Sequence, residues 1–376
     1  MSAPLGLSLF GHALRLHGQA QDEPLPRDGY PYPDEDRHRR HRPPAEQDPR
    51  LRGAGAARVL DRYFGDPAAS VSDLAEAFHD VDVPIHRNEH ITAAALRADR
   101  RRVRATGRWL VRHSTDRCSA TVGLALLATD SAEQDIPMIQ TIGLLSDRFG
   151  PLAADALTRR RGREEALLWL AQRVGGWGRV YVVEALCRQP PRAARHWLLR
   201  HSCAGDFLNG YFAGDVATAA HLHEAVLGSD IDDDLIDHTG RLLRAMADGE
   251  GMGMSLAAYP PASAVLAAHA EHLARQTPAV DRYLTAATIA DHLAERRPER
   301  SGCTAEQRDR IVEQYLVVLN RQDWCDTTRA GFDQVGPYAA WFVENVAARL
   351  RLRAFSSPSP DSATAPLSPP PGTGAS

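Results

Sequence analysis

The chain repeats the stretch Trp109-Leu110-Val111-Arg112-His113-Ser114 as Trp197-Leu198-Leu199-Arg200-His201-Ser202, and the two tryptophans are 88 positions apart. This separation is close to three steps of 29 residues. The same step of 29 carries residues 153–157 onto 182–186, and residues 168–170 onto 197–199. One step accommodates two short helices, which cannot cover their own apolar face unless they stack on a neighbouring pair. The repetition therefore predicts an all-α fold, an α-solenoid of stacked helical hairpins.

The spacing of apolar residues also indicates helices throughout the chain. Ile311, Tyr315 and Leu319 recur every four positions, and the alternation that is typical of strands is not found. Helix starts marked by a capping residue or an early proline are expected at Asn88, Asp135-Ile136-Pro137, Gly150-Pro151 and Thr304.

Residues 175–186 read Gly-Gly-Trp-Gly-Arg-Val-Tyr-Val-Val-Glu-Ala-Leu. This stretch resembles the second-helix signature of a bacterial group of short HEAT-like helical-repeat proteins of unassigned function, and the resemblance covers about residues 100–350. It implies stacked helix pairs, and an interaction scaffold as the usual role. It implies no catalytic residue and no cofactor for this chain.

Composition divides the chain into three parts. Residues 1–53 are predicted to form a flexible N-terminal arm, because prolines, charges and histidines dominate residues 19–53 and offer too little apolar surface to order them. Residues 54–354 are predicted to form the HEAT-like solenoid, and residues 355–376 a disordered Ser/Pro-rich tail. Whether residues 1–18 dock on the body is left open.

All 44 basic residues are arginine, because the chain contains no lysine. This excludes a phosphate-binding loop that ends in Gly-Lys and any Schiff-base lysine. The formal net charge of −4 gives no overall attraction to nucleic acids or anionic membranes. The five cysteines lack a C-x-x-C pair, which predicts reduced and mostly buried thiols. No segment reaches about 18 uninterrupted apolar residues, so we expect no membrane span and a cytoplasmic location.

Two motifs resemble metal sites. His86, Glu89 and His90 fit the H-x-x-E-H pattern, in which two histidines on one helix bind zinc and the glutamate activates water. Asn88 is a plausible N-cap, however, so His86 is expected to precede the helix. Asp233-Asp234-Leu235-Ile236-Asp237 matches a diphosphate-magnesium motif, but acids in a first helical turn are an ordinary response to the helix dipole.

Arginines form the most informative surface pattern. Four of them recur every fourth position and lie on one face of a helix, here called the arginine stripe: Arg100, Arg104, Arg108 and Arg112. Residues 97–204 hold nineteen arginines and ten acidic residues, whereas residues 205–257 hold two and ten. The stripe either solvates a repeat surface or docks an acidic partner. Further candidates for a binding surface are Arg159, Arg160, Trp177 and Arg179.

The tryptophans fall into two groups, one candidate for the surface and five expected in the core. Trp177, flanked by glycines, either anchors a partner or fills the wedge between repeats. The other tryptophans are expected in the core: Trp109, Trp169, Trp197, Trp324 and Trp341. Residues 37–42 are expected to form a solvated basic arm with at most weak contacts to anions.

We therefore expect a non-catalytic scaffold that binds a protein partner, preferably an acidic one, on a curved helical surface with the arginine stripe. No enzyme activity, cofactor or metal is expected. Nucleic acid is disfavoured as a partner because the chain is acidic overall and aromatic residues are few. The alternatives are a HEAT-like nucleic-acid-binding protein or DNA-repair glycosylase, and a metal-dependent hydrolase that uses His86, Glu89 and His90. A third is that the arm and tail carry the function.

Overall fold

The computed structural model describes residues 7–40, 46–188, 192–249, 251–295 and 300–356. Within these ranges the chain is helical and forms no β-strand, which confirms the all-α prediction. The first helices are α1 (Leu9–Gln19), α2 (Glu35–Arg40), α3 (Ala54–Gly65), α4 (Val71–Glu76), α5 (Glu89–Arg97), α6 (Arg100–His113), α7 (Arg117–Leu127), α8 (Ile136–Gly143), α9 (Ser146–Thr158), α10 (Arg163–Ala171) and α11 (Gly176–Cys187). They are followed by α12 (Arg195–His201), α13 (Ala213–Ala219), α14 (Leu222–Leu227), α15 (Asp233–Asp248), α16 (Ala262–Leu273), α17 (Val280–Glu295), α18 (Ala305–Leu319), α19 (Gln322–Gly331), α20 (Tyr338–Phe342) and α21 (Ala348–Leu350).

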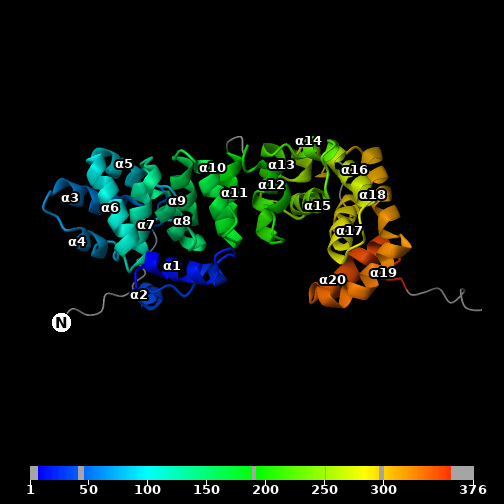
Figure 1. Cartoon of the computed structure of the whole chain (residues 1–376), viewed down its shortest axis with the longest axis horizontal. Helices are drawn as coiled ribbons and strands as arrows, with labels where there is room; N and C mark the ends of the chain where they lie inside the picture. Colours follow the sequence, from blue (N-terminus) through cyan, green and yellow to red (C-terminus); the bar gives the residue numbers. More distant parts are fainter. Residues whose placement is uncertain (1–6, 41–45, 189–191, 250, 296–299, 357–376) are drawn as a thin grey trace, which may run out of the picture.

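Contacts between helices follow two series that run along the long axis of the molecule (Figure 1). In one series, α5, α7, α9, α11, α13, α15 and α17 each contact the next member. In the other, α6 contacts α8 and α8 contacts α10, while α16 lies between α14 and α18. Consecutive helices connect the two series, as α6 does with α7 and α8 with α9. The assignment of these pairs to a HEAT-like solenoid stays a prediction.

The repeated sequence falls on corresponding helices. Trp109, Trp169 and Trp197 lie in α6, α10 and α12. Residues 153–157 and 182–186 lie in α9 and α11, which pack against each other. Positions that are 29 residues apart therefore lie on helices that are one helix pair apart.

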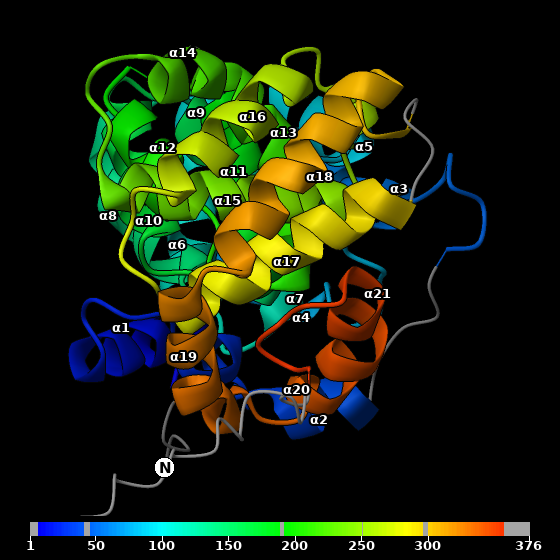
Figure 2. The same ribbon diagram turned by 90° about the vertical axis from the view of Figure 1, so that its right-hand side faces the viewer.

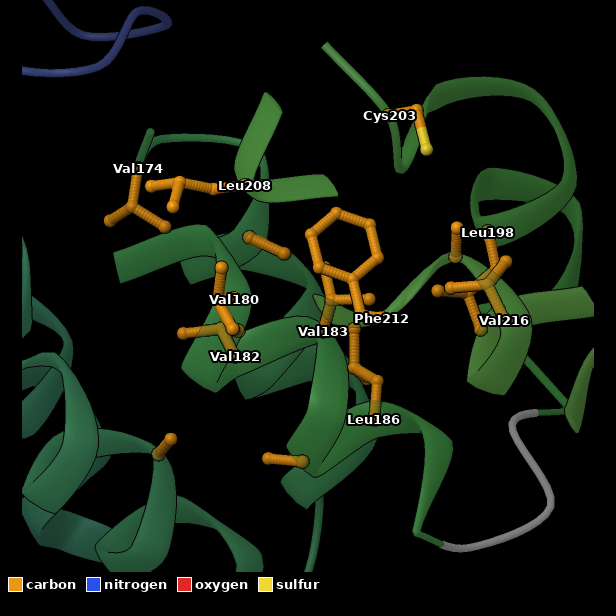
Figure 3. Packing of buried hydrophobic residues seen from close by; sticks show 14 of the residues in the cluster. Val174, Val180, Val182, Val183, Leu186, Leu198, Cys203, Leu208, Phe212 and Val216 are labelled. Atoms are coloured by element: carbon orange, nitrogen blue, oxygen red, sulfur yellow. The ribbon is translucent and has the colours of Figure 1, made fainter. Parts of the chain in front are cut away.

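The contact between α11 and α13 illustrates how adjacent pairs are held together (Figure 3). Phe212, just before α13, is fully buried and lies beside Val183 and Leu186 of α11. Val216 of α13 lies on its other side, close to Leu198 of α12. Burial of each such side chain contributes about 1.5 to 3 kcal/mol, so pairs adhere through apolar area rather than through polar contacts.

The expected helix starts are confirmed with one exception. Asn88 caps α5, Thr304 forms a reciprocal capping box at α18, and Pro137 lies in the first turn of α8. Pro151 does not begin a helix. It lies inside α9, which starts at residue 146, so the Gly150-Pro151 signal predicted the wrong boundary.

The N-terminal segment, meaning residues 7–40, is ordered against the helices, which differs from the predicted flexible arm. Helix α1 contacts α6 and α8 and buries Leu9 and Ala13 completely. The backbone N–H of Leu9 donates to the carbonyl of Ser114 (3.1 Å). The prediction of a flexible arm over residues 1–53 was based on the polar composition of the stretch as a whole. A few apolar residues within it suffice to anchor the segment. Residues 1–6 and 41–45 lie outside the described residues.

The segment is also anchored at the helix starts of the body. Tyr32 is 2% exposed and lies against Phe149 of α9. The hydroxyl of Ser146 at the start of α9 donates to Asp28 (2.7 Å), close to the short helix η1 (Pro26–Gly29). Asp34 forms a buried ion pair with Arg117 at the start of α7 (2.9 Å).

The C-terminal helices lie on the same side of the helical body as α1 and α2, at the opposite end (Figures 1 and 2). Phe355 packs against Phe332 and Phe342, so the folded part extends one residue beyond the predicted limit of 354. Residues 357–376, which make up most of the predicted tail, lie outside the described residues.

Candidate functional site

Three of the four arginines in the arginine stripe pair with two buried carboxylates. Arg100 and Arg104 both bind Asp130, and Arg100 Nη2 lies 2.7 Å from Oδ1. Arg108 Nε lies 2.6 Å from Asp135 Oδ1. Both carboxylate side chains are 3% exposed. These ion pairs fasten α6 to the chain between α7 and α8 and compensate part of the charge of the stripe, although the Arg100 side chain stays 71% exposed.

The pairing around Asp130 predicts a pH dependence. Burial alone would raise the pKa of Asp130, but hydrogen bonds from Arg104 and Arg100 outweigh burial and hold the pKa well below its ordinary value. A depressed pKa in the folded state stabilises the fold above the unfolded value of about 3.9, and this contribution is lost as pH falls below it. We expect Asp130→Asn to lower the free energy of unfolding by about 2 to 4 kcal/mol at pH 7, and by clearly less at pH 3. Urea unfolding at both pH values measures this, and an equal loss at the two would contradict it.

Two of the other predicted surface arginines bind backbone carbonyl groups of their own chain. Arg160 is 1% exposed and donates to the carbonyl groups of Leu127 and Ala132. Arg179 donates to the carbonyl of Val174 and lies over the ring of Trp197. These two predictions were wrong, because the guanidinium groups bind backbone oxygens of their own chain.

The two remaining predicted arginines, Arg159 and Arg112, lie at the surface. Arg159 lies 3.8 Å from Asp155, one helical turn earlier. Arg112 is exposed on the last turn of α6 and has no ion pair in the described part of the chain. A single unpaired arginine is a much smaller feature than the four-residue stripe that the sequence predicted.

The H-x-x-E-H residues do not converge. Helix α5 begins at Glu89, so His86 precedes it as expected, and the His86 ring lies edge-on to that of Tyr181. His90 Nε2 lies 2.7 Å from the carbonyl oxygen of Arg50. The aspartates of the D-D-x-x-D motif are also engaged, because Arg282 binds Asp233 and Asp237.

The most prominent polar hollow lies between the N-terminal segment and the starts of α7, α9 and α11. We call it the segment cleft. Its volume is about 600 Å³. The N-terminal segment, the starts of α7 and α9, and helix α11 each supply part of its lining. The residues that line it are Tyr30, Glu35, His38, Arg39, Ile85, Arg117, Asp147, Arg148, Trp177 and Tyr181.

The arginines that line the cleft differ in whether a carboxylate of the chain already pairs with them. Arg117 is bound by Asp34 and by Glu35, whose Oε2 lies 2.7 Å from Arg117 Nη2. Arg148 donates to the hydroxyl of Thr121 (3.3 Å) and forms no ion pair within the described residues. Arg39 pairs with Asp36 (2.6 Å), so Arg148 is the arginine of this lining that keeps no ion pair among the described residues and that a ligand carboxylate can approach.

The wall formed by α11 is aromatic. Trp177 is 38% exposed and stacks on Tyr181, with ring centroids 6.0 Å apart. Its other face meets Tyr211 of the short helix η3 (Phe207–Tyr211), at 4.8 Å. Trp177 thus contacts two rings, one on α11 and one on η3, while part of its side chain stays exposed, so the anchor and the wedge alternatives both stay predictions. Trp341, which was expected in the core, is 50% exposed at the other end of the molecule.

The sequence predicted Trp177 but missed the rest of the cleft. Tyr30 and Tyr32 alternate with prolines at 31 and 33 in an otherwise polar segment, and these rings were the available signal for docking. His38, on α2, appeared only as part of a basic run. Its ring approaches Asp116 and Cys118, and these three form the one cluster with metal-ligand spacing among the described residues.

Comparison with models of known protein families, with curated proteins and with solved structures found no match. Within the described part of the chain, no helix combines the length and the apolar character that crossing a membrane requires.

Proposed function

We propose that this chain is a non-catalytic binding protein that holds a segment of a partner protein in the segment cleft. One observation carries the proposal: an accessible aromatic wall, Trp177 and Tyr181, faces a guanidinium group, Arg148, that has no carboxylate partner among the described residues. Tryptophan and arginine are the residues that most often dominate binding energy at protein interfaces. The ligand that suits this arrangement is an extended segment with a large apolar side chain close to a carboxylate.

The cleft is supported better than the arginine stripe as the binding surface. Two buried aspartates pair with three of the four stripe arginines, whereas Trp177 keeps 38% of its surface exposed. The same pairing weakens the alternative of a nucleic-acid-binding protein or glycosylase, because fewer guanidinium groups are left for phosphates. The expectation of an acidic protein partner is retained, now at the segment cleft.

A displayed library of short peptides, sorted against the full-length protein, tests the proposal. We expect the enriched peptides to carry an aromatic or large aliphatic residue close to Asp or Glu. Fluorescence anisotropy with one enriched, labelled peptide then gives the dissociation constant. Trp177→Ala is expected to weaken binding by about 30-fold, which corresponds to about 2 kcal/mol. Arg148→Ala is expected to weaken it by about tenfold, because a charge-assisted hydrogen bond is lost.

Trp341→Ala is the matched control, since Trp341 is at least as exposed but lies far from the cleft. It should leave the dissociation constant unchanged. Circular dichroism of each variant verifies that the fold is intact. The proposal is wrong if no peptide is enriched, or if Trp177→Ala and Trp341→Ala weaken binding equally.

A further inference from the structure

We propose that His38, Asp116 and Cys118 form a zinc site that fastens the N-terminal segment to the body. Their ligand atoms, one imidazole nitrogen, one carboxylate oxygen and one sulfur, all lie within 4.8 Å of one another. His38 belongs to α2, whereas Asp116 and Cys118 lie at the start of α7. A metal ion bound by all three would therefore connect two parts of the chain that are distant in sequence.

The donor set and its spacing suit zinc. Imidazole, carboxylate and thiolate are the three ligand types that zinc accepts, and tetrahedral bonds of about 2.0 to 2.3 Å place ligand atoms about 3.5 Å apart. The cluster must contract by about 1 Å to reach that geometry. The change falls within the reach of the His38 side chain, which is half-buried at the wall of the cleft. A water molecule from the cleft would complete the fourth position.

The carboxylate of Asp116 is held by its neighbours. Asp116 Oδ1 accepts from the backbone N–H groups of Cys118 (2.8 Å) and Ser119 (3.2 Å), which leaves Oδ2 for the metal. His79 Nδ1 lies 3.1 Å from Oδ2 and would hold the carboxylate in orientation.

The thiol of Cys118 would become a metal ligand only by losing its proton when the metal binds. Cys118 is 4% exposed, so its thiol and the proton on it are shielded from solvent. Zinc binding would displace this proton to solvent and leave a thiolate on the metal. Arg148 Nη2 lies 4.0 Å from the sulfur and would stabilise the thiolate charge. These conditions favour a structural metal over a catalytic Cys-His pair.

The test uses the full-length protein, freed of metal with a chelator and then titrated with Co²⁺ and Zn²⁺. We expect one equivalent of Co²⁺ to produce the thiolate-to-cobalt charge-transfer absorption and the intense visible bands of tetrahedral cobalt, and Zn²⁺ to displace it. Cys118→Ser should abolish the charge-transfer absorption. Cys118→Ser and His38→Ala should each weaken zinc binding by about 100-fold or more.

Cys187→Ser and His90→Ala are the controls, because both residues lie outside the cluster, and neither should change zinc binding. His38→Ala keeps the proposal testable if Cys118→Ser fails to fold, since His38 is on the surface helix α2. The proposal is overturned if no equivalent of zinc binds, or if the controls weaken binding as much as the cluster variants. Rapid alkylation of Cys118 at neutral pH without metal binding would instead indicate a reactive thiol. Peptide binding by Trp177 is a separate measurement, so either proposal can fail alone.

Discussion

Replacing Asp34 with alanine is expected to lower the free energy of unfolding by about 3 to 5 kcal/mol and to release the N-terminal segment. The Asp34 side chain is 1% exposed and that of Arg117 6%. Asp34 Oδ2 accepts from the backbone N–H (2.8 Å) and from Nε (3.0 Å) of Arg117, and Oδ1 accepts from Nη2 (2.9 Å). Without this carboxylate, a buried guanidinium group retains only Glu35 as an acidic partner. Urea unfolding gives the cost, and hydrogen exchange in α1 shows whether the segment is released.

Two further variants identify the cause of that loss. Asp36→Ala removes an exposed acid that pairs only with Arg39 and should cost less than about 1 kcal/mol. The double variant Asp34→Leu with Arg117→Met should recover most of the loss, because two apolar side chains leave no buried charge uncompensated. If Asp34→Ala and Asp36→Ala are equally stable, the ion pair does not hold the segment.

Gly123→Ala is expected to lower the free energy of unfolding by about 2 to 3 kcal/mol, although alanine is normally preferred over glycine in a helix. A Cβ at position 123 of α7 would lie 2.7 Å from Cβ of Leu110 and 2.9 Å from the backbone nitrogen of Val111. It would also lie 3.0 Å from the carbonyl oxygen of Gly107. Two of these atoms are backbone of α6, so the two helices must move apart to admit the methyl group.

Gly18→Ala is the matched control within another helix. A Cβ at position 18 of α1 meets nothing within 4 Å, so this substitution should stabilise the protein by up to about 1 kcal/mol through helix propensity. Thermal unfolding of the two variants should therefore shift in opposite directions. A shift of the same sign and size for both would show that close packing of α6 on α7 contributes nothing special.

Periodicity was sufficient to predict the helical class because apolar spacing and capping residues act locally. Thr304 and Asn88 cap the helices that they were expected to cap. Pro151 did not locate a start, because α9 begins at Ser146 and contains the proline in its second turn, where the missing N–H removes one helical hydrogen bond. The family of the repeat stays a prediction, since the arrangement of helix pairs alone does not name one.

The candidate site was largely out of reach of sequence patterns, because it depends on pairings between distant residues. The arginine stripe was read correctly as one helical face, but nothing local reveals that Asp130 and Asp135 face it. Composition likewise marked residues 19–53 as unordered, although burial of Tyr32 and Asp34 decides their placement. Trp177 was found because adjacent glycines are a local signal.

The central claim is that the N-terminal segment is docked on the helical body and lines the segment cleft. Hydrogen exchange at the backbone amide of Arg117 tests this claim most directly. Arg117 is the first residue of α7, where an N–H group has no acceptor within its own helix. Its acceptor is Asp34 of the segment. We predict slow exchange at this amide in the intact protein and fast exchange in Asp34→Ala. Fast exchange in both proteins would contradict a docked segment and, with it, the segment cleft.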